Sequence, residues 1–421
     1  MMTKSFKNPD TRFEPAPWLR FINRAMKRAT KNSHRLNEKA ATELIELASR
    51  KMFLEDFGNP RFREGLGALL NAIAAENRFS PVGQRIMKRT IYKCLINRLL
   101  IQRTMRQEPE IMKRKLNRPL FIVGLNRTAT TLLHNLLTLC THVRAPRTWE
   151  LMQPAPPCAD GSRAALRRRR RARSMLWLLR QALPGLRFVH PIEADAVEEC
   201  YPFINHTFTS PAFVMHFGVD EYAHWLEDLD MEHERWVYQE YATQLKILQA
   251  SQPHKRWVLK SAVHLYFLGA LLEEIPNALI VQTHRDPRQM MPSICSLVSC
   301  FRNLVYARLQ LERVGMECLK FVKKTLERGY QARKQNPNVQ IIDIHFDELV
   351  KNPVRQVRQI HQRFGLKWDP LYEQQMKTWL AAHPRGHHGA HRYSMAQFGL
   401  DENLVLSFLP LNTELMENLI S

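Results

Sequence analysis

The chain has 421 residues, of which 45% are apolar, and this excludes an intrinsically disordered polypeptide because enough apolar surface is present to build a sizeable core. Its formal net charge of +22 predicts an anionic partner: a nucleotide, a nucleic acid, an acidic lipid or an acidic substrate. The seven cysteines lack Cys-x-x-Cys spacing, so we expect no disulfide framework. The first residues contain no apolar segment of signal-peptide length, so we expect a soluble, cytoplasmic chain.

The first part of the chain has a helical pattern. Residues 40–56, 65–75 and 84–107 place apolar side chains at helical spacing, and Gly- and Pro-containing segments separate them. We therefore predict an N-terminal helical extension over residues 1–115, packed on an α/β domain over residues 116–421.

Short apolar runs then alternate with helical patterns. The run at 120–124 lies between Pro119 and a helical segment at 130–139, which is typical of a buried parallel strand. A helical insertion is predicted over about 150–250, and it includes a basic helix with five consecutive arginines, Arg167 to Arg171. Further strands are predicted at 256–260, 278–283 and 339–344, with helices at 265–274, 288–302 and 304–334. This alternation predicts an α/β fold with a central parallel sheet and helices on both faces.

The connection from Gly124 to Thr131 (GLNRTATT) is placed like a phosphate-binding turn, between a predicted strand and a predicted helix. Backbone N–H groups and the dipole at a helix start favour an anion. The spacing fits the Walker pattern, but Thr130 stands in place of its Lys and Ala129 in place of its second Gly. The missing Lys argues against a nucleoside triphosphatase, and Arg127 supplies a displaced cation. An ordinary strand-to-helix connection capped by Thr is the alternative.

A second candidate anion site begins where the strand at 278–283 ends. Arg285 follows that strand, Pro287 can open a helix, and Ser293 lies about two turns further on. Arginine offers a rigid fork of donors and serine a hydroxyl, so the two could hold one phosphate at the carboxyl edge of the sheet. The alternative is a helix capped by Asp286 with Arg285 in solvent.

Together these segments resemble the sulfotransferase superfamily, and in particular its broad bacterial-type family. That family has a loop similar to GLPRTGTTLLHNLL, a strand similar to RWVLKSPAHL and a segment similar to IVQTHRDP followed by a serine. This chain has GLNRTATTLLHNLL from 124, RWVLKSAVHL from 256 and IVQTHRDP from 280. The resemblance extends from about residue 40 to 402.

The resemblance implies a P-loop-like three-layer fold and a reaction. The donor would be 3′-phosphoadenosine 5′-phosphosulfate (PAPS), with the bisphosphate PAP as product and without a metal. The sulfuryl group would pass in line to a hydroxyl of a small molecule, lipid or sugar. Two alternatives stay open: a weak or inactive PAP- or PAPS-binding sulfotransferase-like protein, and a P-loop kinase.

Residue roles follow from the same resemblance. Arg127 and Lys260 would place positive charge near the leaving oxygen and the transferring group. The nucleotide-binding residues would be Asn126, Arg127, Thr128, Ala129, Thr130, Thr131, Arg285, Ser293, Arg385 and Gly386.

Three positions depart from the family pattern. Asn126 and Ala262 replace prolines, and Ala129 replaces a glycine. If position 129 needs a positive φ, alanine costs about 1 kcal/mol or more there; with helical φ it would fit.

The general base is open between three residues. In the cytosolic sulfotransferases a histidine follows the middle-strand lysine by two positions, and here that position is Ala262. His264 is one candidate, and Glu198 or Glu199 are preferred because other sulfotransferases use a glutamate. A carboxylate whose pKa is raised by burial would suit this role.

Two further signals are interpreted as non-specific. The arginine run from 167 lacks a nucleic-acid recognition motif, so we predict a solvated helix face and no specific nucleic acid, although a basic surface is compatible with peripheral contact to an anionic membrane. His383, His387, His388 and His391 have ligand-like spacing but no cysteine or carboxylate beside them, so no metal site is predicted.

Overall fold

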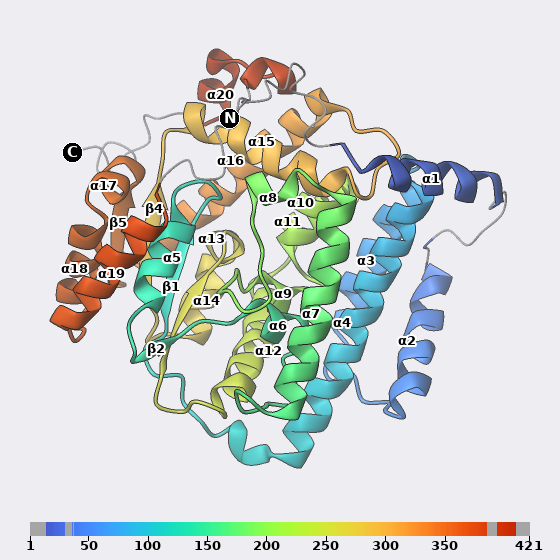
Figure 1. The fold of residues 1–421 in the computed structure, drawn as a ribbon. Helices are drawn as coiled ribbons and strands as arrows, with labels where there is room; N and C mark the ends of the chain where they lie inside the picture. Colours follow the sequence, from blue (N-terminus) through green and yellow to red (C-terminus); the bar gives the residue numbers. More distant parts are fainter. Residues whose placement is uncertain (1–13, 30–35, 37, 385–393, 410–421) are drawn as a thin grey trace.

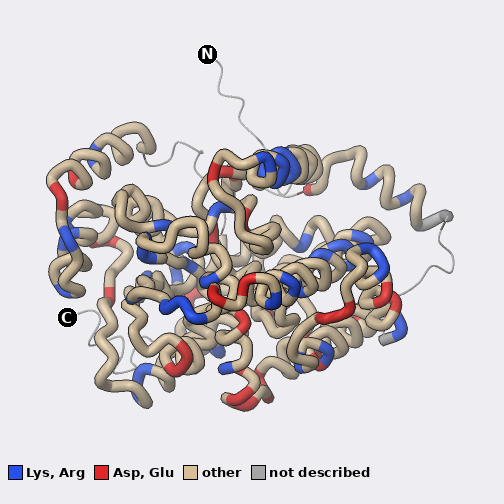
Figure 2. The backbone as a smooth tube through the Cα atoms, turned by 90° about the horizontal axis from the view of Figure 1, so that it is seen from below, with Lys and Arg blue, Asp and Glu red and all other residues tan. Residues whose placement is uncertain are grey.

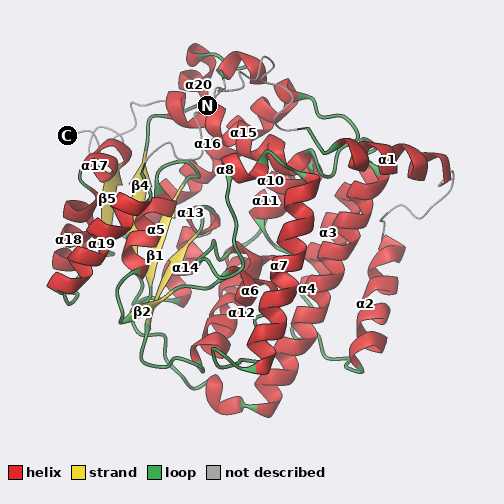
Figure 3. Cartoon of the chain, viewed as in Figure 1, coloured by secondary structure: helices red, strands yellow, loops and turns green. Residues whose placement is uncertain are grey.

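The fold is centred on a five-stranded, fully parallel sheet. The computed structural model describes residues 14–29, 36, 38–384 and 394–409. Within them the strand order is β2-β3-β1-β4-β5; Figures 1 and 3 show the sheet, with β1, β2, β4 and β5 labelled. The strands are β1 (Leu120–Gly124), β2 (Val143–Arg144), β3 (Arg256–Lys260), β4 (Leu279–His284) and β5 (Ile341–His345). The predicted α/β class with a central parallel sheet is confirmed.

Alternate side chains of β1 divide the core into two layers, because successive strand residues point to opposite faces. Leu120 and Ile122 pack with α5 (Thr130–Thr138), α18 (Pro353–Arg363) and α19 (Pro370–Ala382). Phe121 and Val123 belong to the larger cluster on the other face. That face is covered by helices that include α12 (Met231–Gln249), α13 (Val263–Tyr266), α14 (Leu268–Glu274), α15 (Pro287–Arg302) and α16 (Leu311–Gln335). Helices therefore cover both faces, as predicted.

The N-terminal helices add their apolar side chains to the same larger cluster. They are α2 (Glu38–Met52), α3 (Phe62–Ala75) and α4 (Pro81–Gln107), and α1 (Pro17–Ala29) packs beside α4. The remaining α-helices are α6 (Thr148–Met152), α7 (Arg163–Ala182), α8 (Leu186–Val189), α9 (Tyr201–Asn205), α10 (Pro211–Phe217), α11 (Asp220–Glu227), α17 (Phe346–Lys351) and α20 (Glu402–Phe408).

Three elements differ from the sequence predictions. Strand β2 has only two residues, too few for a periodic pattern to reveal. The helix predicted over 265–274 is divided at Phe267, which leaves helical geometry with ψ 31°. The helix predicted from 304 begins at Leu311, because residues 303–310 form a non-helical connection after α15 in which Tyr306 makes a β-bridge with Phe79.

Charge is distributed over many elements of the molecule. Figure 2 shows Lys and Arg on most of the helices, with Asp and Glu between them. Among the described residues, no helix combines the length and apolar character needed to cross a bilayer.

Arg98 of α4 links the N-terminal helices to the rest of the core. Its buried guanidinium donates to the carbonyls of Phe57 and His206 and to Glu240 Oε2 at 2.9, 3.1 and 3.2 Å. It also lies 4.6 Å from the ring centroid of Phe62. Four segments of the chain thus meet at one side chain.

We expect Arg98→Ala to lower the free energy of unfolding by about 3–5 kcal/mol, because it leaves the carbonyls of the buried Phe57 and His206 and the partly buried carboxylate of Glu240 without their donor. Arg106→Ala is the matched control: the side chain lies on the same helix, is 73% exposed and pairs with Asp56, so its loss should cost about 0–1 kcal/mol. Urea unfolding followed by circular dichroism measures both. Equal effects of the two substitutions would contradict the linking role of Arg98.

Candidate active site

The turn after β1 is held against the neighbouring strand β4. Gly124 has φ +157°, and a Cβ at this position would lie 2.3 Å from Thr283 Oγ1, so a side chain does not fit. Thr128 fixes the turn from inside: its hydroxyl donates to the Leu125 carbonyl and lies 2.6 Å from Thr283 Oγ1. Thr128 is buried and does not line the cavity described below. This position indicates that the Thr128 side chain stabilises the turn.

Two non-glycine residues of this turn have left-handed backbone conformations. Arg127 has φ 74° and Ala129 has φ 66°, and Ala129 immediately precedes the first turn of α5. Position 129 therefore takes the conformation in which alanine is unfavourable. Such conformations are concentrated at functional sites, where the surrounding structure enforces them.

The second predicted anion segment lies next to this turn. Arg285 follows β4, and its Nη1 donates to the Arg127 carbonyl at 2.9 Å. Its guanidinium lies 3.9 Å from the ring centroid of Phe346. Arg285 and Thr130 line the same cavity, so the fold brings together two segments that are far apart in the sequence.

Ser293, predicted to bind the 3′ phosphate, forms a hydrogen bond with Arg127. Its hydroxyl accepts from Arg127 Nε at 2.7 Å, and the residue is buried on α15 outside the cavity lining. In this arrangement Ser293 orients Arg127.

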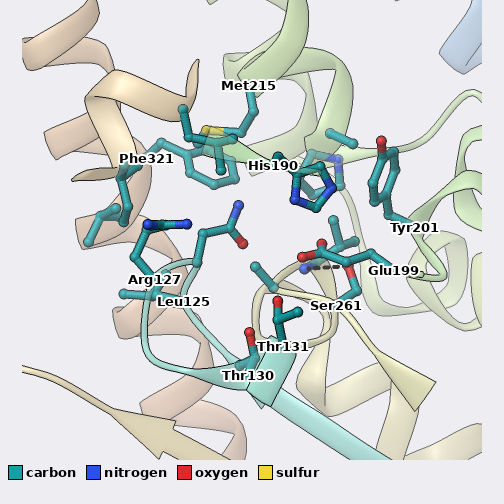
Figure 4. A pocket seen from close by; sticks show the side chains of 18 of the residues that line it. Leu125, Arg127, Thr130, Thr131, His190, Glu199, Tyr201, Met215, Ser261 and Phe321 are labelled. Carbon is teal, nitrogen blue, oxygen red and sulfur yellow. Dashed lines mark hydrogen bonds between the residues drawn. The ribbon is translucent and has the colours of Figure 1, made fainter. Parts of the chain in front are cut away.

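The cavity has a volume of about 310 Å³ and lies at the carboxyl edge of the sheet. Figure 4 shows Thr130, Thr131, Glu199 and Ser261 on one side of it and Met215 and Phe321 on another. Its polar lining includes Asn126, Arg127, Thr130, Thr131, His190, Glu199, Ser261 and Arg285, and its apolar lining includes Met215, Ile294, Leu297, Phe301, Phe321 and Val322.

Lys260 ends β3 and is almost completely buried, with 2% of its side chain exposed. Its ammonium donates to Glu199 Oε1 at 2.9 Å and to Thr131 Oγ1 at 3.3 Å. Burial lowers the pKa of Lys260, but the charges of Glu199 and Glu198 outweigh burial and the pKa is raised. A positive charge is therefore held beside the first turn of α5.

The adjacent glutamates have different environments. Glu199 lines the cavity, whereas Glu198 lies behind it with Oε2 at 3.3 Å from His190 Nε2. Burial raises the pKa of Glu198, but the neighbouring His190 and Lys260 outweigh it and lower the pKa to about 2. The shift is opposite to the one expected of a buried carboxylate base, so Glu198 stays charged at neutral pH.

His264 lies outside the cavity, in the core between α12 and β1. The ring is fully buried, with Nε2 at 3.0 Å from Cys200 Sγ and Nδ1 at 2.8 Å from the Tyr238 hydroxyl. Burial lowers the pKa of His264 to about 3. Its position gives it no access to a substrate in the cavity.

Several cavity residues were not predicted from the sequence. His190, Tyr201 and His216 stand in the insertion between β2 and β3, where no motif marks them. Burial lowers the pKa of His216 to about 4. These residues reach the cavity because the insertion folds over the carboxyl edge of the sheet.

Two predicted nucleotide-binding residues, Arg385 and Gly386, lie outside the described residues, as do His387, His388 and His391. Within the described ranges, no group of three or more His, Cys, Asp or Glu side chains could hold a metal ion.

Comparison with known proteins identifies the family. The model of the family described as "Sulfotransferase family" matches residues 119–370, more than half of the chain. This chain belongs to the sulfotransferase family. The match includes all five strands, Lys260, Arg285 and the turn after β1.

Mycobacterial proteins are among the relatives of this sulfotransferase family member. The omega-hydroxy-beta-dihydromenaquinone-9 sulfotransferase Stf3 of Mycobacterium bovis and that of Mycobacterium tuberculosis are each 24% identical over 283 residues, which cover 63% of this chain and 67% of the relative. The crystal structure of the sulfotransferase STF1 from M. tuberculosis has a TM-score of 0.77 and 28% identity, covering 88% of this chain and 98% of that one. STF9 from Mycobacterium avium gives a TM-score of 0.78 at 24% identity, covering 90% and 96%. The similarity to STF9 supports the P-loop-like fold.

Substitution of Ala129 tests the left-handed conformation of the turn. We expect Ala129→Val to lower the free energy of unfolding by at least about 1 kcal/mol, because a β-branched residue is strongly disfavoured at positive φ. Ala129→Gly should stay within about 1 kcal/mol of wild type, because relief of the left-handed conformation opposes the larger entropy loss of glycine. Urea unfolding compares the three proteins, and equal stability of the Val and Gly variants would contradict the positive φ.

Proposed function

We propose that this protein is a PAPS-dependent sulfotransferase that transfers a sulfuryl group to the hydroxyl of a predominantly apolar acceptor. One observation carries the proposal: the strained turn, Arg285 and the Lys260–Glu199 pair surround a single cavity with an apolar wall.

The polar side of the cavity fits a nucleotide with two separated anionic groups. The N–H groups and hydroxyls of Thr130 and Thr131, at the start of α5, suit the 5′ phosphosulfate. Arg285, at the end of the adjacent strand, suits the 3′ phosphate through its guanidinium fork. The absent Walker lysine makes a triphosphate the poorer fit, and with it the kinase alternative.

Sulfuryl transfer breaks the bond between sulfur and the bridging phosphate oxygen as the acceptor oxygen attacks sulfur in line. The leaving oxygen gains negative charge, which preorganised cations stabilise best. Lys260 is fixed at 3.3 Å from Thr131 Oγ1, and Arg127 is fixed by Ser293. These two side chains supply the charge without a metal ion.

We assign proton acceptance to Glu199. Its carboxylate lines the cavity beside Lys260, where the acceptor hydroxyl has to approach the donor. Glu198 is bound to His190, so we give it the role of orienting that ring.

The acceptor class follows from the apolar wall. Met215, Phe301 and Phe321 belong to that wall, and such a surface favours an apolar molecule with one hydroxyl near the polar end. The relative named for omega-hydroxy-beta-dihydromenaquinone-9 supports an acceptor of this kind.

Calorimetric titration with PAP tests the donor site. We expect Arg285→Ala to weaken PAP binding about tenfold to a hundredfold, because it removes a charged hydrogen-bonding group. Arg358→Ala is the matched control, since that arginine pairs with Glu373 on the α18–α19 surface away from the cavity. Absence of PAP binding by the wild-type protein, or equal binding by both variants, would contradict the proposed donor.

Glu199→Gln tests the proton acceptor. The amide can still accept a hydrogen bond from Lys260 but is not a base, so we expect kcat to fall about 10²- to 10⁴-fold while PAP binding changes little. His190→Gln, at a neighbouring position of the same cavity lining, should reduce kcat much less. Sulfate transfer from radiolabelled PAPS to an apolar alcohol measures both variants.

The outcomes also separate the catalytic proposal from a binding protein. If wild type binds PAP but transfers sulfate to no acceptor, the inactive PAP-binding alternative holds and the role of Glu199 is wrong.

A further inference from the structure

An apolar stripe on α1 faces solvent. Trp18, Phe21, Ile22 and Ala25 are exposed at the spacing that places residues on one helical face. Phe21 is 72% exposed. A different face of α1 attaches the helix to the body of the protein, because Leu19 is buried on it.

The end of α7 carries further exposed apolar side chains close to the start of α1. The backbone N–H of Ala16 donates to the Ala182 carbonyl at 2.9 Å, so the start of α1 adjoins the end of α7, as Figure 1 also shows. Trp177 and Leu178 lie within about 8 Å of that contact along the helix axis, and Trp177 is 60% exposed. We call Trp18, Phe21, Ile22, Trp177 and Leu178 the apolar edge.

Arginines accompany the apolar edge. Arg24 of α1 and Arg170 and Arg171 of α7 are exposed. Two further arginines of these helices form ion pairs, Arg20 with Glu14 and Arg173 with Asp195. Exposed aromatic and aliphatic side chains with arginines at their border are the composition of helices that lie in the interface of an anionic bilayer.

A second copy of the chain is a poorer occupant of this surface. A two-fold contact would bring the same arginines of both copies towards each other, and like charges across an interface are strongly unfavourable. The net charge of +22 increases this repulsion, whereas an anionic membrane turns the same charge into attraction.

We propose that the apolar edge docks the protein on an anionic lipid surface. The side chains of the edge enter the boundary between headgroups and acyl chains, α1 lies along the membrane plane, and the arginines contact lipid headgroups. This docking is independent of the proposed reaction.

Vesicle co-sedimentation tests the docking. Wild type should bind vesicles of phosphatidylcholine mixed with phosphatidylserine, bind vesicles of phosphatidylcholine alone weakly, and lose binding as salt is raised. The double variant Phe21→Ser, Trp177→Ser should bind the anionic vesicles at least about tenfold more weakly, since two large apolar groups are lost. Leu371→Ser is the matched control: this residue is 57% exposed on α19, and its variant should bind like wild type.

A charge variant provides a second, independent readout. Arg170→Gln, Arg171→Gln should weaken binding to the anionic vesicles about fivefold for each charge removed and reduce the salt dependence. Circular dichroism and the melting temperature verify folding; both substituted arginines are exposed, so this variant tests the docking even if the apolar double variant fails to fold.

Three results would overturn the proposal. The first is that wild type binds anionic vesicles no better than vesicles of phosphatidylcholine alone. The second is that the edge variants bind as well as the Leu371→Ser control. The third is that sedimentation velocity shows a dimer of the wild type which Phe21→Ser dissociates. The last result would identify a second copy of the chain as the occupant.

Discussion

The close approach of β1 and β4 at their carboxyl ends is the constraint on which the site depends. Gly124 leaves no room for a side chain against Thr283, and Thr128 ties the following turn to the same threonine. The turn is thereby forced into left-handed conformations at Arg127 and Ala129, and it lies where Arg285 can donate to its backbone. An anion-binding helix start and an arginine fork consequently open on one cavity.

A buried cation is the second requirement of this arrangement. Removing an ammonium from water costs several kcal/mol unless it is paired, and Lys260 is stabilised by Glu199 and Thr131. Glu198 and His190 extend the network behind Glu199. Charged side chains are thus concentrated at one end of the cavity, and apolar side chains line the other end.

The predictions from sequence were most successful where the signal was local. The strands at 120–124 and 256–260 match β1 and β3, because buried parallel strands are short apolar runs bounded by breaking residues. The predicted site residues do not all line the cavity. Thr130 and Arg285 do, whereas the His264 ring lies in the core and the Ser293 hydroxyl binds Arg127. Sequence proximity to Lys260 carried no information on where the His264 ring points.

The pattern of residues along the chain was thus sufficient to predict the parallel sheet, the turn after β1 and the arginine after β4, and to identify the resemblance to sulfotransferases. Each of these depends on residues that are close together in the sequence. Packing between distant segments assigned Glu199 to the cavity and Glu198 to His190, added Tyr201 and His216, and joined α1 to the end of α7. These contacts depend on which side chains pack together and exclude water in the folded core. A local periodic pattern in the sequence does not predict such contacts.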